Sequence, residues 1–560
     1  MDLKLSRFAL GCALAFGLNT FVGCGDNSST KAGNAEKIQN KSIAGVSQKG
    51  PFVTGSVVRL YELDGEYAQT GKSFTGKISS DNGEFTVPNV TLASQYALLE
   101  ANGYFRNEVT GEKSLGTITL NALTDLSDRE NVNINLLTHL EYERALYLVG
   151  MGLSVPAAKK QAETEIFNAF GILGDFENAE DLNIFSEGEG NAALLAFSVL
   201  MQGERNEAEL TELLTKFATD IEMDGEWNDE ATKMEIADWA MEQDFNNGLA
   251  SIRSNINGWN LGTAPDFEKY VRNFWYMNYG LGVCDKDSEG VVKPVANPLS
   301  KEYGNKFYCS ANGWVNLEIW SWDVPKEVRL NPNIAYSSMT DERDGQTYKT
   351  VTIGTQTWMA ENLNYADSVN TPSLMNHSWC YDDDPKKCAV TGRFYSFAAA
   401  IDSVALANDK DNPQFCGVET DCDRLSDENL ALHPIQGICP EGWHLPSNAE
   451  WNILIAYAGG DSVAGTKLKS TGGWGWSSIW GDFFEDNGTD DFGFSALPAG
   501  IRESDTYTSF ADFAYFWSAS QYYAINLCIG NEYRGCGERT FLEYLGWASG
   551  ISIRCIKNSN

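Results

Sequence analysis

The chain has 560 residues, and its 77 acidic residues against 41 basic ones give a formal net charge of -36. This length exceeds what one hydrophobic core usually supports and indicates several domains. A chain this acidic repels phosphate groups, so the composition argues against nucleic acid as a partner.

The first residues have the pattern of a secretory signal peptide, residues 1–23. Lys4 and Arg7 precede an apolar run that begins at Phe8, is too short to span a membrane and is followed by polar residues. The tetrapeptide "FVGC" that ends at Cys24 resembles the bacterial lipobox, which implies cleavage before Cys24 and acylation of that residue. By the same analogy, Gly25 after the anchor favours the outer membrane or cell surface. An ordinary signal peptide that releases an unanchored protein is the alternative.

Cysteine usage also predicts an exported protein. Of the 12 cysteines, ten lie in the second half of the chain, and an even number in an oxidising compartment predicts disulfide bonds. Short spacings suggest local pairs and leave Cys439 and Cys555 for each other. The predicted bridges are Cys284–Cys309, Cys380–Cys388, Cys416–Cys422, Cys528–Cys536 and Cys439–Cys555. Zinc is the alternative, but the sequence has no CxxC knuckle and no histidine pair at ligand spacing, so no metal or other cofactor is expected.

Residues 24–41 are polar and predict a flexible linker behind the lipid anchor. Residues 42–125 alternate short apolar runs with turn signals such as Asp64-Gly65, as strands do. The stretch "GSVVRLYELDGEYAQTGKSFTGKISSDNGEFTVPNV" resembles the carboxypeptidase regulatory-like, transthyretin-like β-sandwich. That resemblance implies a structural spacer without catalytic groups.

Residues 126–257 change to helical spacing, as in "INLLTHLEYERALYLV", and predict an α-helical domain. His139 has apolar neighbours and is expected to be buried rather than a ligand. The segment "DIEMDGEWNDEA" is similar to an EF-hand loop, but Ala231 stands where the bidentate acid belongs, so a polar turn between helices is the better interpretation.

Residues 258–338 are rich in Gly, Asn and aromatic residues and are interpreted as a disulfide-containing connector. Residues 339–558 then contain, in order, "QTYKTVTIGTQTWMAENLNY", "RFYSFAAAI", "ICPEGWHLPSNAEWNILIAYAGG", "DDFGFSALPAGIR", "FWSAS" and "GISIRCIK". This series resembles the Fibrobacter succinogenes major paralogous domain and the wider C-type lectin-like group. The resemblance implies an α+β domain whose terminal strands come together, closed by a bridge at the place of Cys439–Cys555. The expected fold class is therefore multidomain: a β-sandwich, an α-helical domain and an α+β C-type lectin-like domain.

The segment "CPEGWHLPSNAEWNIL" combines Cys, His and Glu, but its pattern predicts structural roles for these residues rather than a catalytic site. Ser447 and Glu450 form an S-x-x-E capping box at the start of a helix. Trp451, Leu454 and Ile455 then share its apolar face. No catalytic residue is expected in this chain.

Downstream loops supply Trp474, Trp476, Trp480 and Tyr507 among acids and amides, which suits a sugar site, although any one ring could instead pack in the core. The function expected is a bacterial surface lipoprotein that binds a polysaccharide or another surface ligand. A structural protein that binds a second surface protein is one alternative. Another is an oxidase of the formylglycine-generating type, which would need Cys528 and Cys536 as a reactive pair and copper. The acidic run "EDNGTDD" could hold a structural calcium ion, but a solvated turn is the simpler interpretation.

Overall fold

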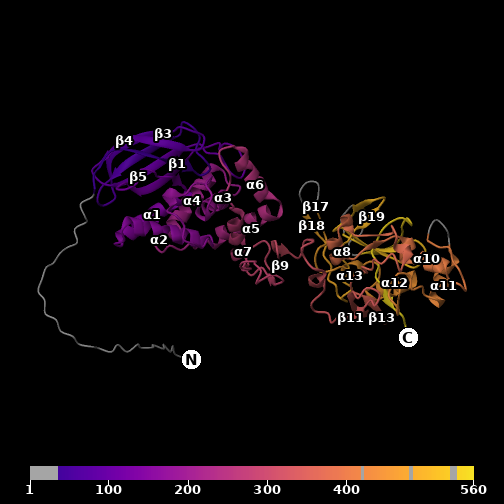
Figure 1. The fold of residues 1–560 in the computed structure, drawn as a ribbon. Coiled ribbons are helices and arrows are strands. Elements are labelled where there is room, and N and C mark those ends of the chain that lie inside the picture. The colour runs from indigo at the N-terminus through magenta and orange to yellow at the C-terminus, as the bar shows by residue number, and fades with distance from the viewer. Residues whose placement is uncertain (1–35, 418–421, 478–482, 530–538, 560) are drawn as a thin grey trace, which may run out of the picture. The chain divides into compact units, whose positions relative to one another are not determined.

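The computed structural model describes residues 36–417, 422–477, 483–529 and 539–559 (Figure 1). The predicted signal peptide and Cys24 lie outside the described residues. The described residues form two compact units, one drawn from residues 36–169, 173–227 and 251–266, the other from residues 170–172, 228–250 and 267–559. Each unit is considered by itself.

The first unit is built on a seven-stranded sheet in the order β6-β5-β2-β3-β4-β1-β7. In β4, buried side chains such as Phe85 and Val87 alternate with exposed ones, because successive residues of a strand point to opposite faces. All seven strands join one hydrogen-bonded series, and the two-sheet sandwich stays a prediction. The strands are β1 (Ile38–Gln48), β2 (Val57–Leu63), β3 (Gln69–Ile78), β4 (Glu84–Leu92), β5 (Tyr96–Gly103), β6 (Ile118–Asp125) and β7 (Ile134–Asn135).

Helices of the first unit cover the sheet and one another (Figure 1). Leu98 and Leu123 of the sheet pack in one cluster with Leu148 of α1 and Ala158 of α2. His139 on α1 is half-buried and accepts a hydrogen bond from the Asn121 backbone N–H, so the expected structural role is confirmed. The helices are α1 (Leu136–Gly150), α2 (Val155–Ala169), α3 (Glu189–Gln202), α4 (Glu207–Ile221) and α6 (Gly248–Gly258), the last crossing the boundary between the units.

The second unit begins with helices α5 (Glu230–Phe245) and α7 (Glu268–Asn278) and the connector strands β8 (Val292–Pro294), β9 (Lys306–Ser310) and β10 (Gly313–Asn316). Between α4 and α5, the EF-hand-like segment is a turn in which Asp229 caps α5. Part of the predicted helical domain therefore belongs with the connector rather than with the sheet. The reason is an aromatic cluster: the ring of Trp275 on α7 lies 5.8 Å from both Phe245 and Phe307.

The remainder of the second unit is an α+β region around a five-stranded sheet in the order β11-β12-β13-β24-β16. The last strand of the chain, β24, pairs with β13 through Ile556 and Trp358, so the two ends of the region meet as expected. The sheet strands are β11 (Ser337–Thr340), β12 (Thr347–Ile353), β13 (Gln356–Met359), β16 (Trp443–His444) and β24 (Ile556–Lys557).

Short helices and hairpins surround that sheet. The other strands are β14 (Ser378–Trp379), β15 (Phe394–Tyr395), β17 (Gly475–Ser477), β18 (Phe483–Glu485), β19 (Ile501–Glu503), β20 (Thr506–Thr508), β21 (Phe513–Trp517), β22 (Tyr523–Cys528) and β23 (Thr540–Tyr544). The α-helices are α8 (Pro385–Thr391), α9 (Phe397–Ala400), α10 (Ser403–Ala407), α11 (Asp427–Leu432), α12 (Asn448–Tyr457) and α13 (Ala464–Leu468).

Helix α12 confirms the predicted capping box. The Ser447 hydroxyl accepts from the Glu450 backbone N–H, and the Glu450 carboxylate accepts from the Ser447 backbone N–H at 2.9 Å. Trp451, Leu454 and Ile455 are buried, as their spacing predicts. The Trp451 ring lies 4.7 Å from that of Trp358 on β13, which ties the helix to the sheet.

Four of the five predicted disulfides form within the described residues: Cys284–Cys309, Cys380–Cys388, Cys416–Cys422 and Cys439–Cys555. Cys528 is also disulfide-bonded, whereas its predicted partner Cys536 lies outside the described residues. The bridges are consistent with an extracellular, oxidising environment. Among the described residues, none of the helices combines the length and the apolar character that crossing a membrane requires.

Candidate functional site: an aromatic surface

Trp474, one of the aromatic residues expected on a ligand-binding loop, is instead completely buried. Its indole N–H is within hydrogen-bonding distance of Ser470 Oγ, at 3.0 Å, and of the Ala496 carbonyl oxygen, at 3.2 Å. The expectation that Trp474 contacts a ligand is therefore corrected: the side chain fills the core beneath the loop and already satisfies its single donor.

The other three candidates differ in what the structure describes. Trp476 lies in β17, but its side chain is outside the described residues, as is the whole of Trp480. Tyr507 lies on β20 and is half-buried. Of these three candidates, Tyr507 is the one whose side chain the structure places at a surface.

Tyr507 belongs to a group of half-buried rings that we call the aromatic surface: Trp320, Trp322, Tyr381, Tyr507 and Phe510. Trp322 stacks on Phe510, with ring centres 5.0 Å apart and an interplanar angle of 13°. The ring centre of Tyr381 lies 5.2 Å from Tyr507 and 5.3 Å from Phe510. Trp320 approaches Phe510 edge-on at 5.3 Å. The five rings therefore form one contiguous patch, and each keeps part of its area accessible.

Local backbone structure holds two segments of this patch in place. Tyr507 is carried by the β19–β20 hairpin, whose turn residues Ser504 and Asp505 both have positive φ, 45° and 73°. Such a turn matches the twist of paired strands and presents the hairpin tip compactly. Tyr381 lies inside the short loop closed by Cys380–Cys388. Both rings are therefore held by constrained backbone.

Trp320 and Trp322 belong to the connector, and a buried arginine, Arg329, holds their segment in place. Arg329 lies beneath Trp320, with its guanidinium carbon 4.9 Å from the ring centre, and donates to the Leu317 carbonyl oxygen at 3.0 Å. Burial lowers the pKa of Arg329 to about 10, which still leaves it charged at neutral pH. The Trp320–Trp322 segment is thereby fastened by a cation–π contact and hydrogen bonds.

Charged side chains border the rings. The Tyr507 hydroxyl donates to Asp383 at 2.6 Å; partial burial and this carboxylate raise the pKa of Tyr507 to about 12. Lys387 lies 5.0 Å from the centre of the Trp322 ring and pairs with Asp382 at 2.5 Å. The arrangement therefore combines apolar ring area with carboxylate acceptors and ammonium donors, the two kinds of contact that orient a polar organic ligand.

Comparison with known families places part of this region in a named group. Residues 351–557 match the family described as the Fibrobacter succinogenes major domain. This part of the chain is a Fibrobacter succinogenes major domain. The prediction made from its ordered motifs is thus confirmed. No match to the chain was found among the curated proteins or the solved structures.

The aromatic surface is not contained in the major domain alone. Tyr381, Tyr507 and Phe510 lie within it, whereas Trp320 and Trp322 precede its first matched residue. Sequence reasoning treated residues 258–338 as a connector and missed this contribution. The Trp-Ser-Trp spacing of residues 320–322 was the available signal, since alternate residues of an extended segment point the same way.

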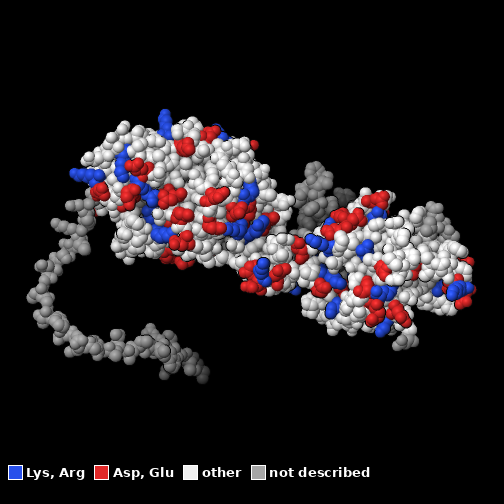
Figure 2. Space-filling view, viewed as in Figure 1, with Lys and Arg blue, Asp and Glu red and all other residues white. Residues whose placement is uncertain are grey.

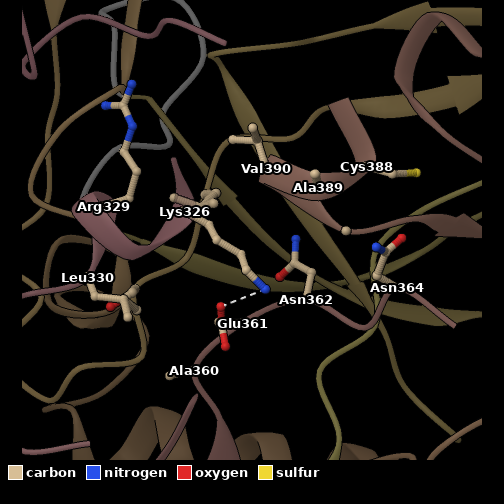
Figure 3. A pocket seen from close by; sticks show the side chains of 13 residues that line it. Lys326, Arg329, Leu330, Ala360, Glu361, Asn362, Asn364, Cys388, Ala389 and Val390 are labelled. Carbon is tan, nitrogen blue, oxygen red and sulfur yellow. Dashed lines mark ion pairs between the residues drawn. The ribbon is translucent and has the colours of Figure 1, made fainter. Parts of the chain in front are cut away.

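Near the start of the major domain, Lys326 and Glu361 line a small cavity (Figure 3). The two side chains form an ion pair at 2.9 Å. The cavity has a volume of about 10 Å³, which is room for about one water molecule. It is too small for a substrate.

Side chains of the acidic run "EDNGTDD", which suggested a calcium site, contact different partners. Asp486 pairs with Lys469 at 2.8 Å, the Asn487 amide donates to Glu318 at 3.1 Å, and Asp490 accepts from the Ser495 backbone N–H at 2.8 Å. Burial raises the pKa of Asp490 to about 7. Among the described residues, no three His, Cys, Asp or Glu side chains are grouped so that they could hold a metal ion.

Proposed function

We propose that the protein is an exported, lipid-anchored surface protein that binds a polysaccharide through its aromatic surface. The observation that supports this proposal most directly is the contiguous patch of five half-buried rings bordered by carboxylates. Ring faces can stack on the apolar face of a pyranose, while carboxylates accept hydrogen bonds from its hydroxyl groups. Adhesion to a glycan-rich surface is the role that follows.

The proposal is for binding without catalysis. The oxidase alternative needs an accessible, activated cysteine pair. Cys528 is fully buried and disulfide-bonded, which supports a structural role for that cysteine. The stretch around His444 and Glu450, where chemistry looked most plausible, is engaged in capping a helix.

A second surface protein is the competing partner, because aromatic residues are also enriched at protein interfaces. The borders of the patch favour a glycan. Asp383 accepts a hydrogen bond from the Tyr507 hydroxyl at the edge of the ring. Beside Trp322, the exposed Asp382 forms an ion pair with the half-buried Lys387. Such groups can exchange their present partners for sugar hydroxyls at little cost, since exposed ion pairs contribute only about 0–1 kcal/mol.

The test is retention of the full exported chain on insoluble cellulose, xylan, mannan and chitin. We expect retention on at least one of these polymers and a loss of affinity of about tenfold or more on Trp322→Ala, because a ring that anchors a ligand contributes at least about 1.4 kcal/mol. Tyr457→Ala is the matched control, since Tyr457 is 55% exposed and lies outside the patch.

Two results would contradict the proposal. One is no retention on any of the four polymers, which would favour a protein partner. The other is retention that Trp322→Ala leaves at the level of Tyr457→Ala, since the aromatic surface would then take no part in binding.

A further inference from the structure

An open groove of about 820 Å³ lies in the second unit, beside the aromatic surface. Its walls come from α5, α7 and the β9–β10 hairpin of the connector, with Glu485 of β18 at one side. The volume falls within the range of about 300–1,000 Å³ that is typical of ligand sites. None of the predictions from sequence concerned this groove.

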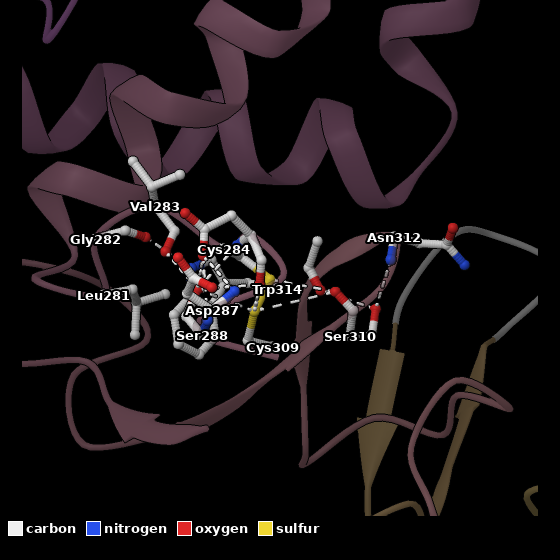
Figure 4. The surroundings of a disulfide bond; sticks show 12 residues. Leu281, Gly282, Val283, Cys284, Asp287, Ser288, Cys309, Ser310, Asn312 and Trp314 are labelled. Atoms are coloured by element: carbon white, nitrogen blue, oxygen red, sulfur yellow. Dashed lines mark hydrogen bonds between the residues drawn. A yellow bond between two sulfur atoms is a disulfide. The ribbon is translucent and has the colours of Figure 1, made fainter. Parts of the chain in front are cut away.

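A disulfide, a hydrogen bond and ring packing hold the walls of the groove in place. The Cys284–Cys309 bridge ties the hairpin to the segment that follows α7, and the Trp314 indole donates to the Gly282 carbonyl oxygen at 2.8 Å (Figure 4). On the α5 side, the Phe245 ring stacks at 6.3 Å on Phe307 of β9. The shape is therefore set by covalent and packed contacts in the absence of a ligand.

Two rings are available to an occupant. Phe245 is 37% exposed on one wall, and Trp320 is half-buried on another. Within the described part of the chain, the Trp320 indole N–H is buried and has no hydrogen-bond acceptor. An occupant of the groove would therefore contact the exposed part of the Trp320 ring rather than its buried N–H.

The polar lining is acidic. Glu242, Asp244, Glu302, Asp323 and Glu485 all face the groove. Among the described residues, the one cation that lines it, Arg272, pairs with Asp244 at 2.8 Å. Desolvation, together with repulsion from Glu318 and Glu302, raises the pKa of Glu485. A polyanion is therefore disfavoured, whereas a neutral chain rich in hydroxyl donors fits.

Trp320 connects this groove with the aromatic surface. It lines the groove and also lies 5.2 Å from Trp322 and 5.3 Å from Phe510. We propose that one neutral polysaccharide chain occupies the groove and the aromatic surface together, so that the ligand is a polymer rather than a short sugar. This inference rests on the proposed function and adds the charge class and the extended length of its ligand.

The experiment compares polymer and short fragments on the full exported chain. Neutral soluble cellulose derivatives, xylan and mannan are titrated beside their disaccharides, and polygalacturonate is titrated as the anionic polymer, with Phe245→Ala and Trp322→Ala variants. We expect Phe245→Ala to weaken binding of the polymer about five- to tenfold and to leave disaccharide binding unchanged. Trp322→Ala should weaken both. Phe541→Ala, on an equally exposed phenylalanine of β23 (38%), is the matched control.

The outcomes separate the two proposals. If Phe245→Ala binds the polymer as tightly as Phe541→Ala does, the inference about the groove is overturned while the proposed function stands. If the parent chain binds none of the polymers, both are overturned. Binding of polygalacturonate as strong as binding of the neutral polymers would contradict the assignment of a neutral ligand.

Discussion

His444, in the stretch that combines Cys, His and Glu, has a structural partner on each ring nitrogen. Nε2 lies 2.8 Å from Glu450 Oε1, and Nδ1 lies 2.7 Å from Asn558 Oδ1. Burial by itself would lower the pKa of His444, but the hydrogen bonds and the Glu450 charge outweigh it and raise that pKa. Burial would likewise raise the pKa of Glu450, yet His444 and the Ser447 contacts lower it. The pair therefore stabilises the fold when both members are charged.

The sign of both shifts defines a pH window. The contribution of His444 is complete below its unfolded pKa of 6.5 and is lost as pH rises through the raised folded value. The contribution of Glu450 is present above its unfolded pKa of 4.5 and is lost as pH falls through the lowered folded value. Between these limits, at pH 5.5, we expect His444→Gln to reduce the free energy of unfolding by about 1–2 kcal/mol, and at pH 8.5 by less.

Urea unfolding at the two pH values measures this difference. His433→Gln is the control, because His433 is exposed on the surface. Equal losses for His444→Gln at both pH values would show that its charge does not contribute.

At the scale of elements, the bridge between Cys439 and Cys555 joins the segment before β16 to the segment before β24. The same two strands pair directly, through His444 and Ile556. The Cys555 carbonyl oxygen also accepts from the Met359 backbone N–H at 3.0 Å. The bridge thus fastens the end of the chain at the centre of the five-stranded sheet, where three strands meet.

Removing this bridge should be more costly than removing a local one. It spans 116 residues, for which loop-closure entropy gives about 5 kcal/mol, against about 2.5 kcal/mol for Cys380–Cys388, which spans 8 residues. We expect the Cys439→Ala/Cys555→Ala variant to have a lower unfolding midpoint in denaturant than the Cys380→Ala/Cys388→Ala variant. The reverse order would mean that native-state strain, rather than chain entropy, governs these bridges.

At the scale of the whole molecule, the distribution of charge over the surface bears on the class of partner. On the face drawn in Figure 2, Lys and Arg side chains are interspersed with Asp and Glu rather than gathered in one basic patch. Pairs such as Arg144–Glu165 at 2.7 Å show this mixing in the first unit. That the partner is not a nucleic acid stays a prediction from the composition.

Lipid anchoring is the prediction that belongs to this scale. Cys24→Ser should abolish incorporation of labelled fatty acid and move the protein from the membrane fraction to the soluble fraction, because multiple acyl chains make a stable anchor. Cys12→Ser, inside the predicted signal peptide, is the control and should keep both properties. Membrane association that survives Cys24→Ser would show that another feature holds the protein there.

Much of the local structure could be predicted because its determinants are neighbours in sequence. The capping box of Ser447 and Glu450, the apolar face of α12 and the four disulfides with both cysteines described follow from spacing, and the ordered motifs of residues 351–557 identify the major domain. In each case, the interacting groups are close along the chain or few enough to pair by elimination.

Burial and the aromatic surface depended on tertiary structure. Arg554, a charged residue near the end of the chain, is completely buried and donates to Asn362 and to the Phe494 and Ser495 carbonyl oxygens, because segments distant in sequence pack around it. Trp474 is buried for the same reason. The aromatic surface joins residues 320–322, 381 and 507–510, which no local pattern relates. The sequence by itself determined local features such as the capping box of α12 and identified residues 351–557 as a major domain, because the groups involved are close along the chain. Only the packing of distant segments decided which rings remain at the surface.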